Sequence, residues 1–127
     1  MSRYADPTQQ LVVEVLVRDL SRSKAFYERF GFRSVREDKS FLVLEWDGCR
    51  LFLDEKSDLP PPPDSPRANV RVLVPDVNRY WKTALEVAAP VAAPIGDRPY
   101  GLRDFTILDP DGFGLRFASW LPGLGPR

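Results

Sequence analysis

Any chemistry performed by this chain must do without histidine. The sequence of 127 residues contains no histidine and a single cysteine, Cys49. A cysteine nucleophile needs a neighbouring group to activate it, and imidazole cannot supply that help here. Carboxylate and guanidinium groups remain: Glu14 could act as a general base, and Arg71 or Arg116 could stabilise an oxyanion. The alternative is that the chain binds a ligand without transforming it, and no catalytic residue is assigned.

A binding site for a small polar organic molecule combines apolar walls with a few charged groups. The predicted ligand-binding residues are Glu14, Trp46, Arg50, Phe52, Asp54, Arg71, Tyr100 and Arg116. A structural alternative stays open, because buried charges are usually paired. In that alternative Glu14, Asp54, Asp104 and the arginines neutralise one another as an internal ion network.

The aromatic residues also admit structural interpretations. Trp46 lies beside a tight turn, where it could pack on the hairpin, contact a second subunit or stack on a ligand. Tyr100 lies in a loop flanked by Gly and Pro, where ligand contact and plain loop packing are both open. Trp81 falls on the apolar stripe of a predicted helix and is expected in the core. Trp120 precedes an irregular tail and hints at an interface.

Composition restricts the class of protein. Hydrophobic residues make up 43% of the chain and charged residues 28%, which is ordinary for a globular protein. Eighteen acidic residues balance 18 basic ones, so nothing favours binding to nucleic acid or to an anionic membrane. No apolar run approaches the roughly 20 residues that cross a bilayer. No signal peptide is visible, and a cytoplasmic location is expected.

The chain repeats itself. The pattern Val-x-Val-x-Val-x-Asp occupies residues 13–19 and recurs at residues 70–76, a constant offset of 57 residues. In each copy an alternating strand pattern leads to an Asp that can cap a helix. The predicted organisation is a first module over about 11–58, a Pro-rich linker over 59–66, a second module over about 67–119 and an irregular tail over 120–127.

Each module is predicted to have the order βαβββ. Residues 1–10 are expected to be irregular. The first module contains strands near 11–18 and 32–37, a helix from Asp19 to about Phe30, and a hairpin of 41–46 and 49–54. Asp47-Gly48 favours a type I′ turn between the hairpin strands. The second module contains strands near 69–74, 103–108 and 114–119, a helix capped by Asp76, and a short edge strand near 91–93.

Strand parity predicts which residues line a cleft. If the regular valines face the helices, the alternate positions face away from them. A register error of one residue would exchange the two faces of any strand. The residues expected in the cleft are Val12, Glu14, Leu16, Arg50, Phe52, Asp54, Asn69, Arg71, Leu73, Asp104, Thr106, Gly114 and Arg116.

The sequence resembles the vicinal oxygen chelate superfamily, the glyoxalase, bleomycin-resistance and extradiol-dioxygenase group. The motifs that carry the resemblance are Val17-Arg18-Asp19-Leu20-x-x-Ser23-x-x-Phe26-Tyr27, Pro99-Tyr100-Gly101-x-Arg103-Asp104-Phe105 and Asp109-Pro110-Asp111-Gly112. The resemblance implies an α+β fold in which two tandem βαβββ modules form a curled mixed sheet with an open cleft, completed in a homodimer.

Many members of this superfamily hold a divalent metal through His, Gln or Glu. The corresponding positions here fall on Val12, Asn69, Arg116 and, near the end of the first module, Phe52. None is a good metal ligand, so the sequence predicts no metal and no cofactor. The similarity is greatest to the metal-free bleomycin-resistance branch, which captures a cationic drug in an acidic groove. We therefore expect a metal-independent protein that binds a small organic molecule, with antibiotic sequestration as one use. The alternative is a metal-independent lyase or isomerase in which Glu14 is the general base.

Overall fold

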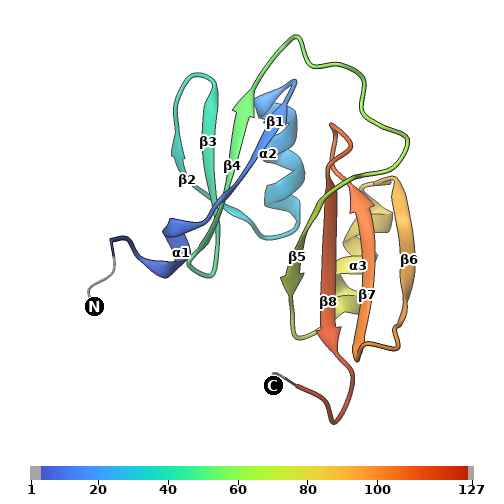
Figure 1. The fold of residues 1–127 in the computed structure, drawn as a ribbon. Helices are drawn as coiled ribbons and strands as arrows, with labels where there is room; N and C mark the ends of the chain where they lie inside the picture. Colours follow the sequence, from blue (N-terminus) through green and yellow to red (C-terminus); the bar gives the residue numbers. More distant parts are fainter. Residues whose placement is uncertain (1–3, 126–127) are drawn as a thin grey trace. The chain divides into compact units, whose positions relative to one another are not determined.

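A computed structural model describes residues 4–125 of the chain, and Figure 1 shows its helices and strands. The chain divides into two compact units, residues 1–61 and 62–127. Each unit contains a four-stranded sheet. The boundary between the units falls within the Pro-rich segment 59–66, which forms no regular secondary structure.

The first unit contains one βαβββ module. A short helix, α1 (Pro7–Gln10), precedes β1 (Val13–Val17) and α2 (Leu20–Arg29). The strands β2 (Arg33–Glu37), β3 (Phe41–Trp46) and β4 (Cys49–Glu55) follow. The sheet order is β1-β4-β3-β2, with β1 parallel to β4 and the other pairs antiparallel.

The second unit repeats this topology. It contains β5 (Asn69–Leu73), α3 (Val77–Glu86), β6 (Val91–Asp97), β7 (Leu102–Leu108) and β8 (Gly114–Trp120). The sheet order is β5-β8-β7-β6, again with a parallel pair of first and last strands. The predicted α+β architecture of two tandem βαβββ modules is therefore confirmed.

The main helices begin where the sequence predicts. Asp19 caps α2 by accepting a hydrogen bond from the backbone N–H of Arg22, and Asp76 caps α3 by accepting from that of Asn78. A capping carboxylate satisfies an N–H group that has no partner within the helix. Between β3 and β4, Asp47 and Gly48 both have positive φ values, 51° and 89°. The expected type I′ turn residues thus have the backbone angles that such a turn requires.

Three local predictions were wrong. Residues 7–10 form α1, because Asp6 accepts a hydrogen bond from the Thr8 N–H and Pro7 occupies the first turn. The edge strand near 91–93 extends to Asp97, since an edge strand with register shifts tolerates Pro94. Trp120 belongs to β8 rather than to the irregular tail.

Burial follows the predicted parity in part of the sheets: Val13 is exposed, and Asp104 and Thr106, expected in the cleft, are buried. Val15 and Val17 of β1 are buried, whereas Glu14 and Leu16 are exposed. In the second unit Trp81 packs against the fully buried ring of Phe105, with 5.1 Å between the ring centroids, as its place on the helix stripe predicts. Within residues 4–125, no helix is long and apolar enough to cross a membrane.

Candidate functional site

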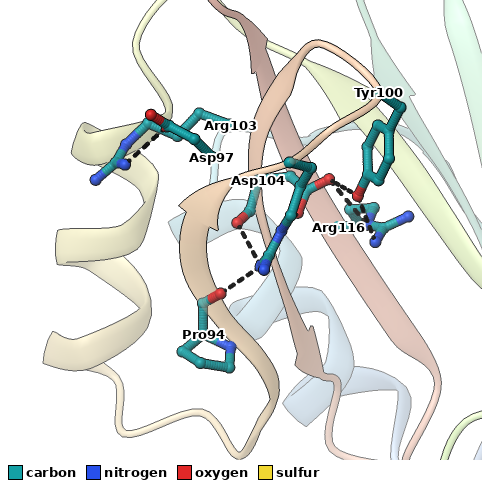
Figure 2. A network of polar contacts seen from close by, with 7 residues as sticks. Pro94, Asp97, Tyr100, Arg103, Asp104 and Arg116 are labelled. Carbon is teal, nitrogen blue, oxygen red and sulfur yellow. Dashed lines mark hydrogen bonds and ion pairs between the residues drawn. The ribbon is translucent and has the colours of Figure 1, made fainter.

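A buried carboxylate organises the polar cluster of the second unit. Asp104 of β7 is fully buried, yet both of its side-chain oxygens accept hydrogen bonds. Arg98 donates from Nε to Oδ1 at 2.7 Å, and the hydroxyl of Tyr100 donates to Oδ2 at 2.6 Å (Figure 2). A buried charge is tolerated when it is paired and hydrogen-bonded in this way.

Arg116 of β8 completes the cluster from the neighbouring strand. Its Nη2 donates to the Tyr100 hydroxyl at 3.2 Å, and its Nε lies 3.6 Å from Oδ2 of Asp104 (Figure 2). That Nε is buried and finds no hydrogen-bond acceptor among residues 4–125. The Arg116 guanidinium also lies 6.0 Å from the centroid of the Tyr100 ring, within reach of a cation–π interaction. We call Arg98, Tyr100, Asp104 and Arg116 the Asp104 cluster.

The cluster changes the acidity of its members. The pKa of Tyr100 is raised, first because the hydroxyl is partly removed from water and second because it donates to Asp104. The pKa of Arg98 is also raised, mainly by its hydrogen bond to Asp104. The Tyr100 hydroxyl therefore stays protonated. It donates a hydrogen bond to Asp104 and accepts one from Arg116, so it links the two residues.

Arg98 was not predicted to take part. It lies in the connection between β6 and β7, which spans only residues 98–101. This short turn directs Arg98 back to Asp104, and Nη2 also donates to the backbone oxygens of Pro94 and Asp104. No signal in the sequence distinguished Arg98 from the other arginines of the chain.

Three predicted site residues are brought together in the second unit. Arg71 of β5 lies directly opposite Arg116 in the parallel β5–β8 pair, so both residues are on the same face of the sheet. Tyr100 contacts Arg116 from the turn between β6 and β7. Arg71 is exposed and forms no ion pair or hydrogen bond with the part of the chain that the structure describes.

The first unit gathers four other predicted residues on one face of its sheet. Glu14 of β1 lies opposite Phe52 of β4, whose ring contacts Phe41 at 5.3 Å. Arg50 is 3.8 Å from a carboxylate oxygen of Glu45. The remaining member, Asp54, lies 3.7 Å from the ammonium group of Lys56. This face therefore combines aromatic side chains with charges of both signs.

Trp46 does not join that group. It lies opposite Cys49, on the face of β3 that also carries the buried Leu42 and Leu44. Its ring contacts Phe32 at 5.1 Å and would lie 3.2 Å from a Cβ atom added to Gly31. Trp46 and Phe52 therefore lie on opposite faces of the sheet, and the ring of Trp46 packs within the first unit, one of the interpretations that the sequence left open. Its alternation with Leu42 and Leu44 indicates this face.

The expected ion network exists only in part. Asp104 is paired with Arg98 and Arg116, as that alternative requires. Glu14 has no partner among residues 4–125, and the partner of Asp54 is a lysine rather than an arginine.

The residues at the superfamily's metal positions do not fit a metal ion. The side chains of Val12 and Phe52 have no donor atom, and the guanidinium of Arg116 cannot be deprotonated to bind a cation. Of the four positions only Asn69 offers a side-chain oxygen, and one amide oxygen does not make a metal site. Across residues 4–125, no three His, Cys, Asp or Glu side chains are grouped so that they could hold a metal.

Comparison with known proteins agrees with the fold. Residues 9–117 match the sequence model of the Glyoxalase/Bleomycin resistance protein/Dioxygenase superfamily, and the chain belongs to this superfamily. No curated protein sequence matches the chain.

Solved structures of the same fold include proteins of different function. A glyoxalase/dioxygenase from Nostoc punctiforme is 17% identical with a TM-score of 0.76, over 95% of this chain and 99% of that one. A bleomycin-binding protein complexed with bleomycin is 22% identical with a TM-score of 0.69, over 87% of this chain and 98% of that one. The fosfomycin resistance protein FosX from Listeria monocytogenes is 15% identical with a TM-score of 0.72, over 88% and 93%. At these identities the similarity establishes the fold alone.

Proposed function

We propose that this protein binds a small organic molecule without a metal and sequesters or carries it, with antibiotics among the candidate ligands. The observation that carries the proposal is the substitution of the metal position on β8 by Arg116. This side chain is held by Tyr100 and Asp104, so the position is occupied by a cation rather than by a metal donor. The bleomycin-binding relative supports a binding role for the fold.

A catalytic role has less support. Glu14, the candidate general base, is exposed and has no hydrogen-bond partner among residues 4–125 that would position it. A general base must lie within hydrogen-bond reach of the proton that it removes. We therefore prefer binding over a lyase or isomerase reaction.

The first experiment is a calorimetric titration of EDTA-treated protein with bleomycin. Binding of one ligand per chain with a Kd below about 1 μM would support sequestration of this antibiotic. If no heat is detected at tens of micromolar, bleomycin is not the ligand. A thermal-shift screen of organic compounds, run in EDTA and again with added Mn²⁺, then tests the wider proposal. Ligands that stabilise the protein only when Mn²⁺ is present would contradict it.

A further inference from the structure

We propose that Arg71 and Arg116 together bind the carboxylate of a flat organic acid whose body lies against Tyr100. This inference rests on the proposed function and names the chemical class of the ligand. It concerns one face of the second unit alone, formed by β5 and β8 with the turn that carries Tyr100.

The face carries more positive than negative charge. Arg71, Arg98 and Arg116 contribute three guanidinium groups, and Asp104 is the acidic residue that contacts two of them. The strand positions paired with Asp104 and Arg116 on this face are Gly96, Thr106, Ala118 and Arg71, none of them acidic. The face therefore attracts an anion, although the whole chain has no net charge.

The carboxylate of Asp104 already accepts a hydrogen bond at each of its oxygens. Its two oxygens accept from Arg98 and from the Tyr100 hydroxyl at hydrogen-bond distances. The Nε of Arg116 is 3.6 Å away, which is too far for a hydrogen bond, and no other acceptor among residues 4–125 reaches it. The charge of Arg116 is therefore compensated only in part, and its side chain is 29% exposed, so an anionic ligand can reach the guanidinium group.

Arg71 supplies a second guanidinium beside the first. The two residues are directly opposite in neighbouring parallel strands, which lie about 4.8 Å apart. Like charges in this arrangement repel each other, and an anion between them removes the repulsion. A carboxylate suits the site because guanidinium groups bind it through two parallel hydrogen bonds.

The exposed ring of Tyr100 indicates that the ligand is flat. The residue is 49% exposed although its hydroxyl is bonded to Asp104, so the ring offers accessible apolar surface beside the cations. Aromatic rings favour stacked or edge contacts with flat partners. A flat organic acid can therefore place its carboxylate on the arginines and its body on the Tyr100 ring.

The test is a titration of EDTA-treated, ¹⁵N-labelled protein with 2-naphthoate, followed by NMR, with 2-naphthamide as the neutral analogue. We expect 2-naphthoate to bind at least about tenfold more tightly than the amide, because the carboxylate forms charge-assisted hydrogen bonds. The shifted amide signals should lie in β5, β8 and residues 98–101. Inorganic phosphate should compete only weakly, since it has no flat body.

Variants locate the contact. Arg71 is exposed, so the Arg71→Gln variant should fold normally. It should bind 2-naphthoate about tenfold more weakly, because the carboxylate loses a charged partner. Arg116→Gln should do the same. Arg103→Gln is the matched control, because Arg103 pairs with Asp97 and Asn78 rather than with the Asp104 cluster. The affinity of this variant for 2-naphthoate should equal that of the wild type.

Three outcomes would overturn the inference: equal binding of acid and amide, unchanged binding by Arg71→Gln, or no binding of 2-naphthoate at millimolar concentration. Equal binding of the two compounds in EDTA would leave metal-independent ligand binding intact. Binding that appears only after Mn²⁺ is added would instead contradict the proposed function.

Discussion

At the scale of single residues, Asp104 shows how this chain accommodates a charge in its interior. The carboxylate is fully buried, but Arg98 and Arg116 are each partly exposed, with 27% and 29% of their side chains accessible. The positive charges thus remain partly hydrated while they compensate a carboxylate that is not. This arrangement lowers the cost of desolvating the ion pairs relative to a fully buried set.

Removing this carboxylate should destabilise the protein. Asp104→Ala leaves Arg98 and Tyr100 without their acceptor and brings the arginines together without a counter-charge. We expect a loss of about 2–3 kcal/mol in the free energy of unfolding, less than for a fully buried pair because the arginines stay partly solvated. Urea denaturation measures it.

The matched control for this prediction is Asp97→Ala. Asp97 pairs with Arg103 on the same hairpin (Figure 2). The side chain of Asp97 is 62% exposed. Exposed ion pairs contribute about 0–1 kcal/mol, so this variant should remain close to the wild type. Equal losses for the two substitutions would show that Asp104 has no special structural role.

At the scale of elements, a side-chain hydrogen bond joins the last strand to the start of the helix in both modules. The first backbone N–H of α2, from Leu20, donates to Glu55 at 2.8 Å, and that of α3, from Val77, donates to Ser119 at 2.9 Å. Glu55 and Ser119 occupy equivalent places, because Leu16 lies opposite Asp54 as Leu73 lies opposite Ala118. The duplication thus preserves the acceptor position but not the residue type.

Ser119 does more than accept from the helix. Its hydroxyl also donates to the backbone oxygen of Val74 at 2.7 Å, and the residue is buried. Ser119→Ala removes both partners at once, leaving one backbone donor and one acceptor unsatisfied. We expect a loss of about 1–3 kcal/mol, measured by chemical denaturation.

Ser34→Ala is the comparison for this variant. The Ser34 hydroxyl donates to Glu28 at the surface, at 3.2 Å. Its removal should change the free energy of unfolding by less than about 0.5 kcal/mol. A Ser119→Ala protein as stable as Ser34→Ala would mean that water replaces the lost hydrogen bonds.

At the scale of the whole molecule, β1 and β5 are each the outer strand of their own sheet. Each carries an exposed leucine at the same place in the repeat, Leu16 at 45% and Leu73 at 44%. An outer strand with exposed apolar side chains favours contact with another strand or surface. This supports the expectation of a homodimer, which stays a prediction.

Sedimentation equilibrium should give twice the mass of one chain. Leu16→Lys and Leu73→Lys, each placing a charge on an outer strand, should shift the protein toward the monomer. Leu85→Lys is the control, since Leu85 is 57% exposed on α3 rather than on an outer strand. A wild-type protein that sediments as a monomer at all concentrations would rule out the dimer.

The sequence by itself determined the local features of this protein. Alternating valines, capping aspartates and the Asp47-Gly48 turn predicted the βαβββ order of both modules. Each of these signals operates over a few residues, through backbone preferences and the two-residue period of a strand. The repeat at residues 13–19 and 70–76 then extended the prediction to the whole chain.

Only the tertiary structure decided which side chains meet. The Asp104 cluster depends on the register of β7 against β8 and on a turn short enough to bring Arg98 and Tyr100 back to the sheet. Trp46 packs against Phe32, whereas the sequence left hairpin packing, subunit contact and ligand stacking all open. A shift of one residue in any strand would exchange its two faces. Long-range register is set by the packing of the complete sheet, so no local pattern in the sequence encodes the contacts of the Asp104 cluster.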